Sequence, residues 1–267
     1  MQELLLIDGK PNVRLIQEIK ASGGLHKYLD YFGCIILSPI MPDSLLKLIN
    51  FDTYEYILEE LKPDQYLSPD GSTYNGFISY SHDQIKQILE LTEKLVVRFP
   101  DITIIGLIKG CTLKQMEYHL ERMIELGINK FCLHAGDFLH NGSKYSKSQI
   151  ISYAREIRKK VPYLMIYGIG SKFYFQRFHH ANAFVTNSHF IQGFNHMVIC
   201  GVTWTNFKGE VTNEIIMKNF GYLQNQVEVQ DNQCDLTKWI SCLSDAKMGE
   251  STIRIVVENK MMKVLGE

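Results

Sequence analysis

Short apolar runs alternate with longer amphipathic segments along most of the chain. The short runs are rich in β-branched and other apolar residues and end in polar residues or glycine, which is typical of buried strands. The longer segments place apolar residues at i, i+3 and i+4, the spacing of one helix face. The predicted strands are residues 4–7, 34–37, 65–68, 102–108, 130–134, 163–167 and 183–186, and the predicted helices are 83–98, 113–126, 148–160 and 172–179.

This alternation predicts the fold class. Strands that alternate with helices form βα units, which pack into a parallel sheet covered by helices. We therefore predict an α/β protein with a (β/α)8 barrel of the TIM type. Thr112, Ser146 and Ser171 stand where the N-caps of three of its helices are expected.

The pattern changes after Trp204. Two more helical segments, 214–227 and 236–243, are followed by a strand-like run at 252–257. We therefore predict a barrel domain at residues 1–204 and a small, mainly helical appendage at residues 205–267.

Composition and charge limit the classes of ligand and fold that the chain can have. The chain has 267 residues, 45% of them hydrophobic, which is enough for the core of one barrel domain. Its formal net charge of -1 gives no general attraction to nucleic acid, so binding would need a local patch. We interpret the basic segments 144–147 and 155–160 as solvated helix faces rather than a phosphate track. A tRNA or DNA ligand stays open, without support from the charge.

The cysteines and the N-terminus predict the compartment. The cysteines are widely spread and lie mostly in apolar runs, which favours reduced, buried thiols over a disulfide framework. No basic segment precedes a long apolar stretch, and no apolar run approaches the roughly 20 residues of a membrane helix. We therefore expect a cytoplasmic protein that is neither exported nor embedded in a membrane. The six cysteines are Cys34, Cys111, Cys132, Cys200, Cys234 and Cys242.

One motif carries a family resemblance. Residues 23–28 read GGLHKY, and residues 34–39 read CIILSP. These two segments resemble the tRNA-guanine transglycosylase family. In that family GGLHKF is followed, after a short spacer, by ILTDSGGFQ, which contains a catalytic aspartate. Ser38 stands in the place of that aspartate. A shift of a few residues in the comparison would instead bring Asp30 or Asp43 near it.

The next two strand ends resemble the part of the family's pocket that reads a purine. Residues 66–70 match a strand ending in an aspartate that reads the Watson–Crick edge, and Asp70 is kept. A carboxylate suits a guanine-type N1–H and amine because it accepts from both. The alternative is a solvated aspartate that opens a turn. Residues 105–110 resemble FGIVQGG, with Lys109 in place of the glutamine. A lysine ammonium only donates hydrogen bonds, so it favours a carbonyl or an anion as the ligand group. The alternative is that Lys109 is an ordinary surface lysine.

The later strand ends continue the resemblance. Residues 131–137 lie where the family has AIGGLAVGE, and His134 is there either a pocket group or a structural histidine. Residues 167–170, YGIG, match the family's MGVG. In residues 182–186, Val185 replaces the nucleophilic aspartate of DMFDC. The resemblance implies that the substrate-binding residues are Asp70, Gly106, Lys109, His134, Gly136, Asp137, Gly168 and Gly170.

The replaced residues argue against the family's reaction. Valine can neither attack a ribose carbon nor take a proton, and Ser38 would need a neighbouring base. The family's zinc ligands, Cys-x-Cys-x-x-Cys and a later histidine, are also missing, with Lys218 in the histidine's position. The spacing of His189, His196 and Cys200 is a weak metal signal. We therefore expect neither a metal nor a cofactor.

Three hypotheses follow. The first is a degenerate family member that keeps a pocket for a guanine-type or 7-deazaguanine-type base and acts as a binding or partner subunit. The second is an enzyme that uses the same pocket with different chemistry and transfers or hydrolyses a deazaguanine adduct through Ser38, Asp70, His134 or Asp137. The third is a structural protein whose barrel is filled by Val185, Met41 and their neighbours. The resemblance implies a homodimer or a heterodimer with another protein, and a link to queuosine or to deazapurine DNA modification and antiviral defence.

Overall fold

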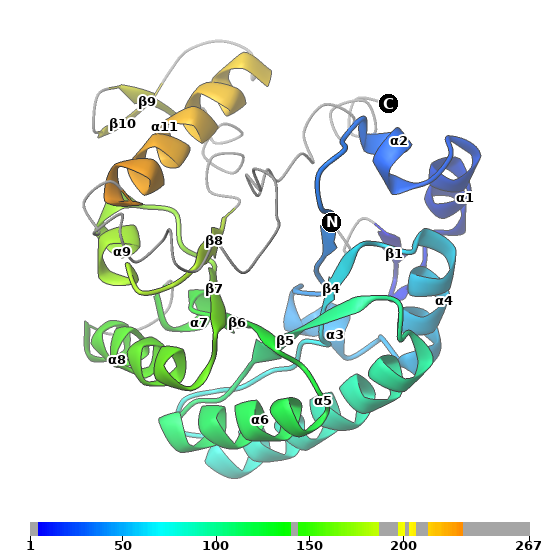
Figure 1. Ribbon diagram of the computed structural model, residues 1–267, viewed down its shortest axis with the longest axis horizontal. Coiled ribbons are helices and arrows are strands. Elements are labelled where there is room, and N and C mark those ends of the chain that lie inside the picture. Colours follow the sequence, from blue (N-terminus) through cyan, green and yellow to red (C-terminus); the bar gives the residue numbers. More distant parts are fainter. Residues whose placement is uncertain (1–4, 140–143, 187–196, 201–202, 207–212, 232–267) are drawn as a thin grey trace. The chain divides into compact units, whose positions relative to one another are not determined.

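The computed structural model describes residues 5–139, 144–186, 197–200, 203–206 and 213–231 (Figure 1). They form a mixed α/β protein. Its main sheet has six parallel strands in the order β3 (Ile36–Leu37), β4 (Gln65–Leu67), β5 (Thr103–Ile108), β6 (Lys130–His134), β7 (Tyr163–Tyr167) and β8 (Ala183–Val185). Sequential neighbours in a parallel sheet require crossover connections, and helices provide them.

The chain divides into two compact units. Of the described residues, the first unit contains those up to Leu133 together with Val161–Tyr163. The second contains His134–Lys160 and the residues from Leu164 onward. The predicted boundary between residues 204 and 205 stays a prediction.

Six of the predicted strands lie in the parallel sheet, but the first does not. β1 (Leu6–Ile7) pairs antiparallel with β2 (Lys10–Pro11) in a hairpin. The turn residues Asp8 and Gly9 have φ of 51° and 77°, which suits the tight turn of a hairpin. Over the described ranges, the parallel sheet therefore has six strands rather than the eight of a complete TIM-type barrel.

The predicted helices are present with shifted ends. They are α5 (Ile78–Arg98), α6 (Leu113–Glu125), α8 (Lys144–Lys160), α9 (Lys172–Arg177) and, in the tail, α11 (Asn213–Asp231). The Thr112 side chain caps α6 by accepting from the Gln115 N–H at 3.2 Å, as predicted. Ser171 is the N-cap of α9 without a side-chain cap hydrogen bond. The Ser146 prediction is wrong, because Ser146 lies inside α8. The predicted elements at 236–243 and 252–257 lie outside the described residues.

Several elements were not predicted. They are α1 (Val13–Ala21), α2 (Leu25–Leu29), α3 (Asp43–Leu46), α4 (Phe51–Leu61), α7 (Gly136–Leu139) and the antiparallel strands β9 (Met197–Cys200) and β10 (Thr203–Asn206). For α4 the signal was present. Tyr54, Ile57, Leu58 and Leu61 follow the helical spacing and are buried, and Asn50 caps the helix.

The core of the first unit surrounds β5. Residues 104–108 are all buried, as expected of a parallel strand covered on both faces. Gly106 lies within this run, and a Cβ there would meet the Met123 Sδ at 2.4 Å. Glycine at this position therefore lets α6 pack closely on the strand.

The thiols agree only in part with the prediction. Cys111 and Cys132 are free and buried, but Cys34 is free and exposed because it precedes β3 rather than lying in it. Within the described residues, no helix is both long enough and apolar enough to cross a bilayer.

The histidine of the GGLHK motif links several segments of the first unit. His26 lies in α2, with its Nδ1 2.8 Å from the Tyr31 carbonyl oxygen and its Nε2 3.1 Å from Asp64 Oδ2. The same Asp64 oxygen accepts from the Ile35 N–H at 2.7 Å. A carbonyl and a carboxylate can only accept, so both ring nitrogens donate only in the protonated, positively charged form of His26, which these two contacts favour.

This arrangement predicts a pH dependence of stability. The pKa of His26 is raised by the Tyr31 carbonyl and, to a smaller extent, by Asp64, against an opposing effect of partial burial. Its stabilising contribution is therefore full below about pH 6.5, the ordinary pKa, and is lost as the pH rises through the folded-state pKa. We expect the difference in unfolding free energy between the native chain and His26→Gln, measured in urea, to shrink above that pH. A difference that does not change with pH would contradict the charged state of His26.

Candidate functional site

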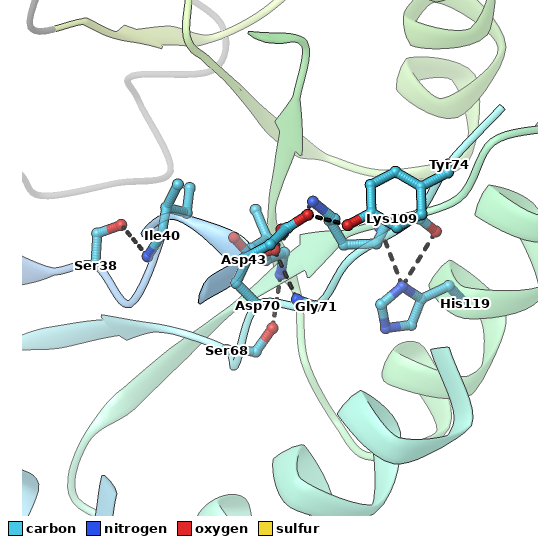
Figure 2. A network of polar contacts seen from close by, with 10 residues as sticks. Ser38, Ile40, Asp43, Ser68, Asp70, Gly71, Tyr74, Lys109 and His119 are labelled. Atoms are coloured by element: carbon cyan, nitrogen blue, oxygen red, sulfur yellow. Dashed lines mark hydrogen bonds and ion pairs between the residues drawn. The ribbon is translucent and has the colours of Figure 1, made fainter. Parts of the chain in front are cut away.

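The ends of β4 and β5 bring two predicted site residues into direct contact. Asp70 follows β4, Lys109 follows β5, and Lys109 Nζ lies 3.0 Å from Asp70 Oδ1 (Figure 2). The exposed fraction is 3% for the Asp70 side chain and 5% for the Lys109 side chain. The interpretations of Asp70 as a solvated aspartate and of Lys109 as a surface lysine are therefore wrong. Charges are rarely buried unless they are paired, and these two are.

Backbone contacts fix both strand ends. Ser68, which precedes Asp70 by two residues, donates its N–H to the Ile105 carbonyl and accepts from the Leu107 N–H at its Oγ, both at 2.8 Å. The Gly71 N–H donates to Asp70 Oδ1 at 2.7 Å. Oδ1 thus takes both the Gly71 N–H and the Lys109 ammonium.

The charge of Asp70 acts on two buried neighbours. Burial, and after it the negative charge of Asp70, raises the pKa of the Tyr54 phenol and of the Cys132 thiol. Both groups therefore stay protonated and neutral at physiological pH. Their burial places the carboxylate in surroundings of low polarity, where hydrogen bonds to a charged group are stronger than in water.

His119 supports Lys109 from α6 and was not identified from the sequence. It is fully buried, and its Nδ1 accepts from the backbone N–H of Lys109 at 3.1 Å. Burial lowers its pKa to about 3. A signal existed in the sequence, because His119 stands with Met116, Leu120 and Met123 on the buried face of an otherwise amphipathic helix.

Three residues were compared with the catalytic aspartate that the family resemblance implies; Ser38 and Asp43 follow β3, and Asp30 precedes it. Ser38 comes directly after β3, and its Oγ accepts from the Ile40 N–H at 3.3 Å, which is a local turn contact. Asp43, the first residue of α3, accepts a hydrogen bond from the Tyr74 hydroxyl (Figure 2). That hydrogen bond is the main cause of the raised pKa of Tyr74. Asp30 is the left-handed C-cap residue of α2.

Tyr74 belongs to an exposed aromatic group at the start of α5. Its ring stacks on Tyr80 with centroids 5.8 Å apart and meets Phe77 edge-on at 6.5 Å. The backbone N–H of Tyr74 donates to the Ser81 Oγ at 3.0 Å. These contacts join the loop between Asp70 and α5 to the first turns of that helix.

In the second unit, the remaining predicted residues follow β6, β7 and β8. His134 ends β6, and its ring lies edge-on to Tyr167 with centroids 5.2 Å apart. The Gly168 N–H donates to the carbonyl of Val185, the last residue of β8, at 3.0 Å. Gly136 and Asp137 begin α7, and Gly170 lies between β7 and α9.

Gly168 and Gly136 touch through their backbones. Gly168 has φ of +84°, and a Cβ there would lie 3.0 Å from both the Cα and the N of Gly136. Glycine at position 168 is thus required by its positive φ and by the close approach of the Gly136 backbone. Contact of these glycines with a ligand stays a prediction.

No metal site is formed in the part of the chain that the structure describes, where no three His, Cys, Asp or Glu side chains gather suitably. Lys218, which the sequence resemblance aligns with a zinc-binding histidine, lies exposed on α11. His189 and His196 lie outside the described residues.

Comparison with known proteins gives no assignment for this site. No protein-family model matches the chain, and no curated protein matches it.

Proposed function

We propose that the chain binds a guanine-type or 7-deazaguanine-type base at the Asp70–Lys109 pair and does not carry out base exchange. The observation that carries this proposal is the 3.0 Å contact between two buried, oppositely charged side chains at neighbouring strand ends. Active and binding sites of parallel α/β proteins lie at the carboxyl ends of the strands.

The pair complements the edge of guanine. Guanine presents one carbonyl oxygen, O6, beside two donors, N1–H and the 2-amino group. A carboxylate accepts hydrogen bonds and an ammonium donates them, so Asp70 suits the two donors and Lys109 suits O6. Asp70 and Lys109 are the residues that the family resemblance assigns to the base, which supports the same ligand.

The replaced residues support binding without exchange. Ser38 makes a local turn contact, and Val185 cannot act as a nucleophile. On the same resemblance we propose that the parallel sheet belongs to a (β/α)8 barrel, and that the protein is cytoplasmic and works as a dimer or with a partner protein.

Isothermal titration with guanine, 7-cyano-7-deazaguanine and 7-aminomethyl-7-deazaguanine tests the proposal. We expect binding to at least one of them, weaker binding of hypoxanthine, which lacks the 2-amino group, and none of adenine. Asp70→Asn should weaken binding about tenfold or more, because a hydrogen bond to a charged group contributes about 1.5–3 kcal/mol.

Asp83→Asn is the matched control, since Asp83 is exposed on α5 and makes a long contact with Lys86. It should leave the affinity unchanged. If the native chain binds no member of the panel, the proposal for a free base is wrong, and a structural role or recognition of a macromolecule alone would replace it.

A further inference from the structure

A buried histidine holds the backbone of the candidate ligand-binding lysine. Lys109 is the first residue beyond β5, so its N–H lies past the last paired residue of the strand, Ile108. Its acceptor is Nδ1 of His119 at 3.1 Å (Figure 2). The same Nδ1 lies 3.4 Å from the Lys109 carbonyl oxygen, so it contacts both backbone polar groups of Lys109. It accepts from the N–H or donates to the oxygen according to which ring nitrogen holds the proton.

The buried histidine lowers the stability of the fold. His119 has no exposed surface, and within the described residues its Nε2 has no hydrogen-bond partner. A buried polar atom without a hydrogen-bond partner destabilises a protein, whereas a leucine on this helix face would carry no such penalty. Packing alone therefore does not explain a histidine among Met116, Leu120 and Met123.

A second side chain of α6 holds the same turn. The Cys111 N–H donates to Gln115 Oε1 at 3.1 Å, and Gln115 Nε2 donates to the Ile78 carbonyl at 2.8 Å. Gly110, between the two held residues, has φ of +154° and lies close to the Met116 backbone. The connection from β5 to α6 is thus fixed by His119 at Lys109 and by Gln115 at Cys111.

We propose that His119 is a positioning residue whose Nδ1 fixes the backbone of Lys109, so that the ammonium is held at Asp70 with the spacing that a guanine-type edge requires. This role rests on the proposed function for its effect on affinity. Its effect on the Asp70–Lys109 contact does not depend on any ligand.

Three substitutions separate this role from packing. His119→Asn keeps an acceptor on Cγ, where Nδ1 is attached, so it should keep the Lys109 contact. His119→Gln carries its acceptor one atom further out, and His119→Leu has none. We expect His119→Leu and His119→Gln to weaken guanine binding about tenfold, the effect of one lost hydrogen bond near a charge, and His119→Asn to stay within about threefold of the native chain.

A spectroscopic readout keeps the test independent of the ligand. The ¹⁵N signals of the Lys109 backbone amide and ammonium should move in His119→Leu and return towards their native positions in His119→Asn. If wild type binds no base but the signals follow this order, the proposed function fails and the positioning role stands. If the Lys109 signals stay unchanged in His119→Leu, or if Asn and Leu have the same effect, the positioning role is wrong.

Discussion

Replacing Lys109 by methionine is expected to lower the free energy of unfolding by about 3–5 kcal/mol, the usual cost of removing one partner of a buried ion pair. Methionine keeps most of the length of the lysine stem, so the change acts mainly on the charge. Asp70 would keep the hydrogen bond from the Gly71 N–H but lose its ammonium partner, in surroundings that include Tyr54 and Cys132. Urea unfolding of the two chains measures the difference.

The exposed pair of Lys20 and Glu60 supplies the control. Their side chains are 43% and 23% exposed, so Lys20→Met should cost less than about 1 kcal/mol. Similar losses in Lys20→Met and Lys109→Met would mean that the Asp70–Lys109 pair is not buried in solution.

The double variant Asp70→Leu with Lys109→Met separates stability from function. Apolar residues of similar volume often replace a buried ion pair with little loss or a gain of stability. We therefore expect the double variant to recover most of the stability lost in Lys109→Met and to bind no base. That result would show that the fold does not need the pair, and would leave ligand recognition as the reason for its charges.

The sequence predicted the strands of the parallel sheet well because their apolar runs end sharply in polar residues or glycine. The family resemblance predicted Asp70 and Lys109 as site residues but not their contact, which depends on β4 and β5 being neighbours. His119 was not predicted as a site residue because a histidine on the apolar face of a helix usually has a structural role. The Asp43–Tyr74 hydrogen bond was not predicted because it joins the start of α3 to the loop before α5, and no periodic pattern specifies the conformation of that loop.

The strand at 4–7 shows a different limit. Its apolar pattern is correct for a strand, and the pattern cannot tell whether a strand pairs in parallel or antiparallel. The decisive signal was the pair Asp8-Gly9, which favours a hairpin turn and is followed at once by β2. Turn chemistry, rather than hydrophobic spacing, would have removed this strand from the predicted barrel.

The glycines of the second unit lead to the other large expected effect. Gly168→Ala should lower the free energy of unfolding by about 2–4 kcal/mol, from the cost of a positive φ and from overpacking against Gly136. The added Cβ would lie 3.0 Å from backbone atoms of Gly136, which cannot move aside as a flexible side chain could. Urea unfolding measures the loss.

Gly127→Ala is the matched control for Gly168→Ala, because Gly127 has the same φ of +84° and no atom within 4 Å of the added Cβ. It should cost about 1–2 kcal/mol, the conformational part alone. The excess in Gly168→Ala then measures the clash with Gly136 by itself. Equal losses in the two variants would show that the backbones of Gly136 and Gly168 are not in contact. The pair would then be free to face a ligand, as the family resemblance implies, instead of being committed to packing the ends of β6 and β7.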